Sequence, residues 1–420
     1  MTGTRGGKTA LVLAGGGFTG AVYEIGALRA IDDLLISRSV NEFDIFVGTS
    51  AGALVATFLA NGSSPEEMLK VLEGSNKDVR SIGRKDIFSL NYRNYLKWLL
   101  KLPFKLVDVW GENIDHLNEV TLFDLGWNLL GALPSGLYDD LALDHYIAQT
   151  LAKLGHHNLF DEVERELYII ATDLNTGERV IFGKGYTSNV PISRTVAASS
   201  ALPLLYKPVS IGGNEYIDGS LRGSASLDLA IEKGATLVVC INPLVPLDSL
   251  NEQPQRIRGK RGSFRLSDKG IQSIANQSLR IFSHAGLHYH IKQLRRTHPE
   301  VDIILIEPDP KDYQMFFYNI MHYSARLTVA QHGFESVTIN LAEDYHIYKE
   351  ILARHGIPIT RRLVIEEIAE IAASDYNPSV IRRVLEARST YCTQRRRNTP
   401  ICQLERTLAE LDLLLNEQQH

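Results

Sequence analysis

The sequence holds one serine in a setting that is typical of enzyme nucleophiles. Gly48-Thr49-Ser50-Ala51-Gly52 follows an apolar run and precedes a stretch of small and aliphatic residues, which predicts a strand, a tight turn and a helix. This pattern matches a nucleophile elbow, where the helix N-terminus favours negative charge on the serine oxygen. GxSxG occurs nowhere else in the chain, so Ser50 is the candidate nucleophile; a chance match in a glycine-rich protein is the alternative.

An earlier glycine-rich turn could bind developing negative charge. Gly15-Gly16-Gly17-Phe18-Thr19-Gly20 also follows a predicted strand and precedes a predicted helix, so backbone N–H groups there could face an anion. The turn lacks the Lys-Ser/Thr ending of a P-loop and the GxGxxG spacing of a dinucleotide site. We therefore interpret Gly15, Gly16 and Gly17 as an oxyanion hole beside Ser50. A tight turn without chemistry is the alternative.

A serine hydroxyl also needs a base. The Asp-Gly dipeptide occurs once, in Asp218-Gly219-Ser220, directly after the strand-like run Glu215-Tyr216-Ile217. At its ordinary pKa of ~3.9 an aspartate is a weak base, so we expect apolar neighbours to desolvate Asp218. The alternative is a turn aspartate that binds its own backbone.

Histidine is the more common partner of a catalytic serine, so a Ser-His-Asp esterase stays open as an alternative. The histidines that could complete such a triad lie in no recognisable loop motif: His284, His288, His290, His298, His322 and His332. The first two are one helical turn apart and could in principle bind a metal. No HExxH or CxxC pattern accompanies them, so we interpret them as a helix face and expect neither a metal nor another cofactor.

Together, the motifs resemble the patatin-like phospholipases in content and order. The matching segments are Gly15-Gly16-Gly17 with Gly20, Gly48-Thr49-Ser50-Ala51-Gly52, Ala198-Ser199-Ser200-Ala201-Leu202-Pro203 with Lys207-Pro208-Val209, and Asp218-Gly219. They span about residues 8 to 245, and the strand and helix pattern extends the resemblance to about residue 340. The chain departs from the family pattern at Thr19, where the family commonly has arginine or lysine, and at Ser220, where it has glycine or alanine.

The resemblance implies a two-residue catalytic pair without histidine, in which Ser50 is the nucleophile, Asp218 is the base and the glycine loop is the oxyanion hole. It implies a serine-dependent lipid acyl hydrolase of the phospholipase A or lysophospholipase type. An acyltransferase would use the same residues. A non-hydrolytic scaffold or regulatory module of the same fold is the alternative that Thr19, Ser220 and the charged C-terminal region suggest.

The elements that must position these residues alternate between strands and helices. Such alternation predicts an α/β fold, a three-layer sandwich with a mostly parallel central sheet. The predicted strands are Thr9–Ala14, Phe43–Val47, Leu167–Thr172, Val180–Phe182, Leu237–Ile241 and Asp302–Ile306, and the helices near the motifs are Ala21–Arg38 and Ala51–Ala60. We expect an acyl hydrolase domain over residues 1–340 with an inserted cap at about 65–165, and a charged helical extension over 341–420.

Composition limits the remaining function classes. Apolar residues make up 44% and charged residues 22% of the chain, which is ordinary for a globular protein. The net charge of -5 gives no field that would attract nucleic acid. Three widely spaced cysteines (Cys240, Cys392 and Cys402) favour a reducing compartment, and glycines interrupt the N-terminal apolar run too early for a secretion signal. We expect a soluble cytoplasmic protein, and the sequence leaves its oligomeric state open.

Residues 80–105 form a local basic region on this acidic protein, with an excess of six positive charges. Arg93, Lys97 and Lys101 recur every four residues, and Tyr92, Tyr95, Leu96, Leu99 and Leu102 fall on the other side of a predicted helix. Such a helix could lie on an anionic membrane surface and make the protein a peripheral one. A lid that packs over the active site is the alternative.

Overall fold

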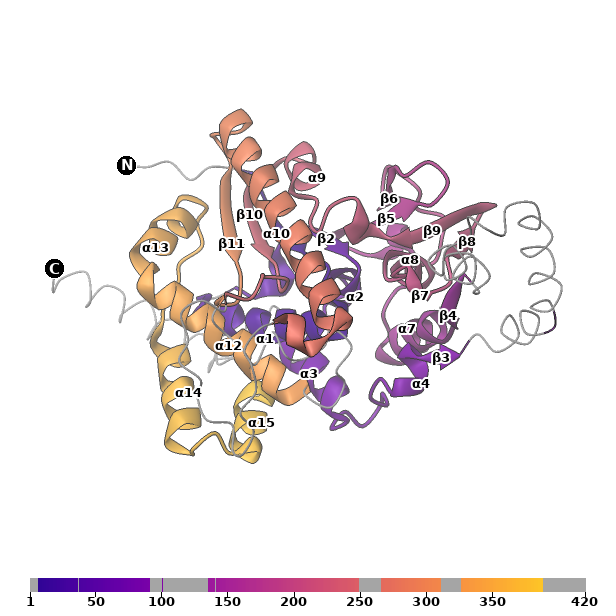
Figure 1. Ribbon diagram of the computed structural model, residues 1–420. Helices are drawn as coiled ribbons and strands as arrows, with labels where there is room; N and C mark the ends of the chain where they lie inside the picture. Colours follow the sequence, from indigo (N-terminus) through magenta and orange to yellow (C-terminus); the bar gives the residue numbers. More distant parts are fainter. Residues whose placement is uncertain are drawn as a thin grey trace, which may run out of the picture.

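The computed structural model describes residues 7–36, 38–90, 100, 135–139, 141–248, 266–310 and 326–387. A central sheet runs through the molecule with helices on both sides (Figure 1). Its strands are β1 (Lys8–Leu13), β2 (Ile45–Thr49), β5 (Glu166–Asp173), β6 (Arg179–Gly183), β8 (Val209–Ile211), β9 (Asn214–Asp218), β10 (Ala235–Ile241) and β11 (Asp302–Ile306). A small second sheet contains β3 (Ser89–Leu90), β4 (Gly136–Asp139) and β7 (Leu204–Tyr206).

The described helices fall between and after these strands. They are α1 (Gly17–Leu34), α2 (Ala51–Ala60), α3 (Pro65–Glu73), α4 (Arg84–Ile87), α7 (Leu141–Leu154), α8 (Ile192–Ser199), α9 (Leu227–Glu232), α10 (Ile271–Thr297), α12 (Arg326–Glu343), α13 (Tyr345–Arg354), α14 (Arg362–Ala373) and α15 (Pro378–Glu386). Short 3-10 turns occur at Val40–Glu42, Phe160–Glu162, Gly219–Leu221 and Leu266–Lys269.

The strand order in the central sheet is β11-β10-β1-β2-β5-β9-β8, with β6 also paired to β5. The strands from β11 to β5 pair in parallel, whereas β6, β9 and β8 pair antiparallel. The predicted α/β fold with a mostly parallel sheet is therefore confirmed. Because β1 and β2 are parallel neighbours, the turns that follow them meet at one edge of the sheet.

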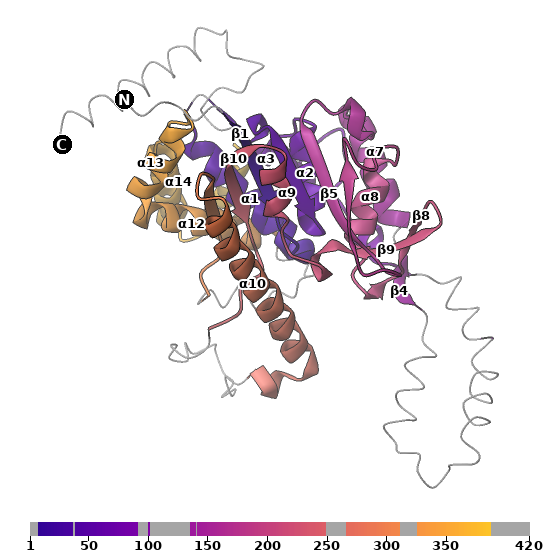
Figure 2. The same ribbon diagram turned by 90° about the horizontal axis from the view of Figure 1, so that it is seen from above.

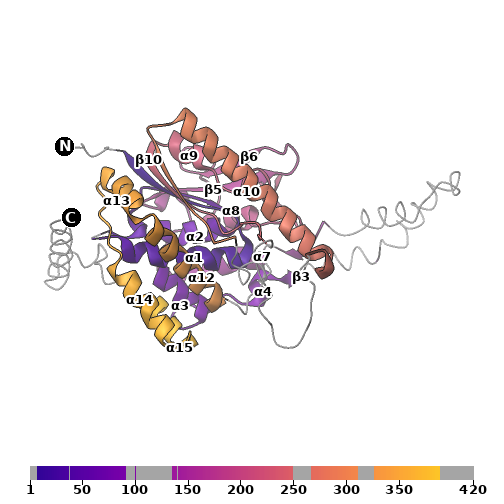
Figure 3. The same ribbon diagram turned by 60° about the vertical axis from the view of Figure 1, so that its left-hand side comes forward.

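Both faces of the sheet are buried, which explains the continuous apolar runs of its strands. Along β1, Leu11 and Leu13 belong to one core with α1 and α2, and Val12 belongs to a second core with α9 and α10. In Figure 3, α10 lies above the strands and α1 and α12 lie below them; Figure 2 shows the same elements from above. The result is the expected three-layer arrangement.

Helices α1 and α12 cross so closely that their backbones are nearly in contact. A Cβ atom added to Gly26 of α1 would collide with the carbonyl group of Ala330, and one added to Gly333 of α12 would collide with the carbonyl group of Tyr23. The Tyr23 hydroxyl also donates a hydrogen bond to Ser336 Oγ at 3.0 Å. Helices α14 and α15 pack nearby, α14 on α1 and α15 on α3. Segments from both ends of the chain thus enclose α1.

All six predicted strands are present, and the predicted helix Ala51–Ala60 matches α2. The helix predicted at 21–38 begins at Gly17 and ends at Leu34, because the glycine turn itself starts the helix and Leu35 leaves it to bridge to Ile359. The division at residue 340 and the cap at 65–165 stay predictions, and residues 91–99, 101–134 and 388–420 lie outside the described part. Among the helices that the structure describes, none is long and apolar enough to cross a membrane.

Candidate active site

Ser50 lies on a strained turn between β2 and α2. Its backbone angles are φ 54° and ψ -120°, a conformation that residues with a side chain rarely adopt. Glycines flank the turn because the backbone approaches neighbours closely: a Cβ at Gly48 would collide with Ala53, and one at Gly52 would collide with the carbonyl of Leu13. This geometry is that of a nucleophile elbow, in which strain presents the hydroxyl at the end of the sheet.

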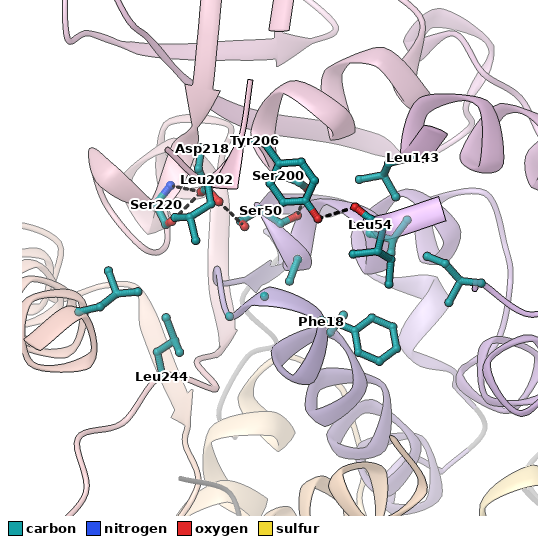
Figure 4. Close-up of a pocket in the computed structure, with 17 residues that line it drawn as sticks. Phe18, Ser50, Leu54, Leu143, Ser200, Leu202, Tyr206, Asp218, Ser220 and Leu244 are labelled. Carbon is teal, nitrogen blue, oxygen red and sulfur yellow. Dashed lines mark hydrogen bonds between the residues drawn. The ribbon is translucent and has the colours of Figure 1, made fainter. Parts of the chain in front are cut away.

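Asp218 meets Ser50 directly. Ser50 Oγ donates a hydrogen bond to Asp218 Oδ2 at 2.7 Å, and both side chains point into the same space in Figure 4. The sheet creates this meeting, because Asp218 ends β9, β9 pairs with β5, and β5 pairs with β2. The two residues that the sequence singled out as nucleophile and base are therefore in contact, although 168 positions separate them in the chain.

The Asp218 carboxylate is buried and oriented by hydrogen bonds. Its Oδ1 accepts from the Ser220 amide at 2.8 Å and from the Ser220 hydroxyl at 2.6 Å, which leaves Oδ2 directed at Ser50. Burial raises the pKa of Asp218, and the hydrogen bonds from Ser220 and Ser50 offset part of this rise. Ser220, a departure from the family pattern, thus acts on the protonation of the candidate base.

Two further serines hold the elbow in place. The fully buried Ser199 Oγ accepts a hydrogen bond from the Ser50 amide at 2.7 Å and donates one to the carbonyl of Ile170 at 2.6 Å. Ser200 Oγ donates to the Ser50 carbonyl at 3.3 Å. Sequence reasoning noted both residues within a motif but assigned them no role, because nothing local indicates that α8 ends against the elbow.

The three glycines of the loop differ in their relation to the site. The Gly15 amide donates to the carbonyl of Ser224 at 3.1 Å, so it points away from a substrate, whereas Gly16 and Gly17 line the pocket beside Ser50. Gly17 has φ 62° and begins α1, whose first-turn N–H groups have no carbonyl partner within the helix. Thr19 is buried in α1. An anion at this place would meet backbone donors and the positive end of a helix dipole.

A pocket opens next to these groups. Polar atoms of Ser50, Ser200, Asp218 and Ser220 gather on one side of it (Figure 4). The rest of the wall is mostly apolar and comes from several elements: Phe18, Ala21, Leu54, Ile82, Ile87, Leu143, Leu202, Tyr206, Leu244 and Leu279. Such a cavity can hold a hydrocarbon chain with a polar group directed at Ser50.

The other candidate residues lie elsewhere. None of the 17 residues that line the pocket in the described part of the chain is a histidine. His284, His288 and His290 lie on α10, His298 follows it and His332 lies on α12, whereas His322 is outside the described residues. Of the basic stretch 80–105, Arg80 pairs with Asp86, and the predicted stripe of Arg93, Lys97 and Lys101 falls outside the described residues.

The chain has similarity to proteins of known structure and sequence. It is similar to VipD from Legionella pneumophila, with 14% identity and a TM-score of 0.33 over 81% of this chain and 68% of that one. It is 27% identical to protein R571 of Acanthamoeba polyphaga mimivirus over 50% of this chain and 57% of that protein. It is 22% identical to "Probable lipid hydrolase 463L" of Invertebrate iridescent virus 6 over 53% of this chain and 63% of that protein.

The match to these relatives is partial, since the chain spans less than two thirds of the length of either viral protein. The family model of the patatin-like phospholipases matches residues 11–231, a segment that contains the glycine loop, Ser50 and Asp218. The chain therefore belongs to the patatin-like phospholipase family.

Proposed function

We propose that this protein is a serine lipid acyl hydrolase of the phospholipase A or lysophospholipase type, with Ser50 as nucleophile and Asp218 as base. The observation that carries the proposal is the 2.7 Å hydrogen bond between these two side chains at the edge of an apolar pocket. Family membership and the printed name of the iridescent virus relative support a lipid substrate.

The reaction follows from the positions of the groups. Ser50 Oγ attacks the carbonyl carbon of the ester while its proton passes to Asp218 Oδ2. The carbonyl oxygen gains negative charge, which the N–H groups near Gly16 and Gly17 stabilise. Collapse of this intermediate breaks the ester bond, and the leaving alcohol takes the proton from Asp218. Water then attacks the acyl-serine, again giving a proton to Asp218, and releases the fatty acid and the serine hydroxyl.

The environment of Asp218 suits this task. A carboxylate with an ordinary pKa binds the serine proton weakly, and burial makes Asp218 a stronger base. The short, direct contact with Ser50 means that proton transfer needs no intervening imidazole. The apolar pocket wall accepts the acyl chain and excludes water from the reacting groups.

Labelling with a fluorophosphonate probe tests the proposal, because the probe reacts with activated serines. We expect the probe to modify Ser50, as identified by mass spectrometry of the labelled peptide, and purified protein to release free fatty acid from phospholipid or lysophospholipid. Ser267→Ala, which changes an exposed serine outside the pocket, should label like wild type. Asp218→Asn should label at least about 100-fold more slowly. A folded protein that takes up no label at Ser50 and releases no fatty acid would contradict the proposal and favour the scaffold alternative.

A further inference from the structure

A second cluster of chemically reactive side chains lies on the opposite face of the sheet from α1, on the long helix α10 (Figure 3). His284 and His288 are one turn apart on this helix, and their ring centroids are 4.0 Å from each other. Both face Glu307, the residue that directly follows β11. The cluster is separate from the Ser50 pocket, since none of its three residues lines that pocket.

The donor atoms of the three residues are spaced for a single metal ion. His288 Nε2 lies 2.9 Å and His284 Nε2 lies 3.7 Å from Glu307 Oε2, and one ligand atom of each residue falls within 4.8 Å of the others. Tetrahedral Zn²⁺ with bonds of about 2.0–2.1 Å needs donor atoms roughly 3.3 Å apart, which these separations bracket. A pair of histidines at positions i and i+4 of a helix, completed by a carboxylate, is a recognised donor set for such ions.

The surroundings also fit a bound ion. Asn242 Nδ2 donates to Glu307 Oε1 at 2.6 Å, which orients the carboxylate and leaves Oε2 toward the histidines. The imidazole side chains are 28% and 47% exposed, so an ion can enter from solvent and keep water as a further ligand. The nitrogen donors favour Zn²⁺, Co²⁺ or Ni²⁺ over Mg²⁺ and Ca²⁺, which prefer oxygen.

We propose that His284, His288 and Glu307 bind one divalent transition-metal ion of the Zn²⁺ class, which fastens α10 to the carboxyl-terminal ends of β10 and β11. The site lies outside the catalytic pair and supplies no step of the hydrolysis. It revises our interpretation of the two histidines as a plain helix face, because their carboxylate partner is distant in sequence and only the fold brings it close.

The metal ion would connect two elements that form part of the wall of the substrate pocket. Asn242, which holds Glu307, begins the segment that contains Leu244, and Arg280 of α10 donates to the carbonyl of Val245 at 3.1 Å in the same segment. Leu244 of this segment and Leu279 of α10 both line the pocket. An ion that joins α10 to Glu307 therefore ties together two elements that carry one side of the pocket.

Metal binding is measured on the full chain after dialysis against a chelator. Equilibrium dialysis with Zn²⁺ should give one ion per chain at micromolar or lower concentration, whereas Mg²⁺ and Ca²⁺ should not compete. Co²⁺ should produce a visible absorption band that Zn²⁺ abolishes. At a free Zn²⁺ concentration 100-fold above the Kd, the Tm should rise by about 3–5 °C, and amide hydrogen exchange in α10 should slow.

The variants separate metal binding from folding. His284→Gln with His288→Gln should weaken Zn²⁺ binding at least about 100-fold and remove the Tm rise, while its Tm in chelator stays near that of wild type. Glu307→Gln should weaken binding at least about tenfold. His298→Gln, which changes the histidine directly after the same helix, should bind like wild type. Equal Zn²⁺ binding by wild type and the double variant, or no binding by wild type at about 100 μM, overturns the site. Binding without slower exchange in α10 overturns the fastening.

Discussion

Two neighbouring turns, one at Gly16 and Gly17 after β1 and one at Ser50 after β2, line one pocket from the same edge of the sheet. Both connect a buried strand to a helix, and both contain a residue with positive φ: 62° at Gly17 and 54° at Ser50. Glycine adopts this conformation without steric cost, whereas a residue with a Cβ atom is strained by roughly 1–3 kcal/mol.

The difference shows where this protein tolerates strain. The glycine turn presents backbone N–H groups and needs no side chain, so it takes the residue that fits the conformation without strain. The serine turn must present a hydroxyl, so it retains a strained residue and supports it with Ser199, Ser200 and Asp218. We infer that the first turn binds charge and the second forms the covalent bond.

Of the changes to the two turns, removal of the Ser50 hydroxyl should lower activity most. We expect Ser50→Ala to lower kcat for ester hydrolysis by about 1,000-fold or more, because the remaining backbone donors can bind the transition state but cannot form an acyl-enzyme. Fatty acid release and circular dichroism of the same sample check activity and folding. A folded variant with near wild-type turnover would show that the serine turn is not the nucleophile.

A side chain added to the glycine turn should have an intermediate effect. Gly17→Ala places a Cβ at φ 62°, so we expect a loss of about 1–2 kcal/mol in the free energy of unfolding and about a tenfold lower kcat as the donors move. Gly62→Ala is the matched control, since Gly62 has φ 92°, has open space around it and lies outside the pocket. It should lose stability but keep kcat. Equal kcat in both variants would mean that the glycine turn has no part in the reaction.

The serine turn, unlike the glycine turn, depends on an ionisable partner, Asp218. Ser220 lowers the pKa of that partner. The two Ser220 hydrogen bonds favour the ionised carboxylate, so Ser220→Ala, which removes the hydroxyl, should raise the pKa of Asp218 further. The base must be ionised to act, and the acid limb of the profile of kcat/KM against pH should therefore move to higher pH. An acid limb that stays in place or moves to lower pH would mean that the hydroxyl does not act on the base.

The smallest expected effect concerns strain itself. Ser50→Gly relieves the strained φ but increases the entropy of the unfolded chain, so we expect it to be about 0.5–1 kcal/mol more stable than Ser50→Ala. Urea unfolding of the two inactive variants measures the difference. If Ser50→Ala is the more stable of the two, the strain at this position is smaller than the entropy cost of glycine, roughly 0.5–1 kcal/mol.

Local patterns predicted the strands and the two motif turns, since an apolar run followed by glycines specifies a buried strand and a tight turn without reference to the rest of the chain. Contacts between distant segments were not predictable in the same way. The Gly15 amide was expected to face substrate, but it binds the carbonyl of Ser224. Ser199 supports the elbow from another helix, and Glu307 reaches two histidines of α10 from the end of β11. In each case the partner is fixed by packing rather than by spacing.

Because α1 and α12 cross so closely, the fold cannot be divided between them without exposing α1. The family match ends at residue 231, yet α12, at 326–343, covers the helix whose first turn lines the pocket. A fragment that ended after the last recognisable motif would leave the apolar face of α1 open to water. The smallest transferable unit of this fold is therefore longer than its signature, and a chimera should exchange α1 and α12 together.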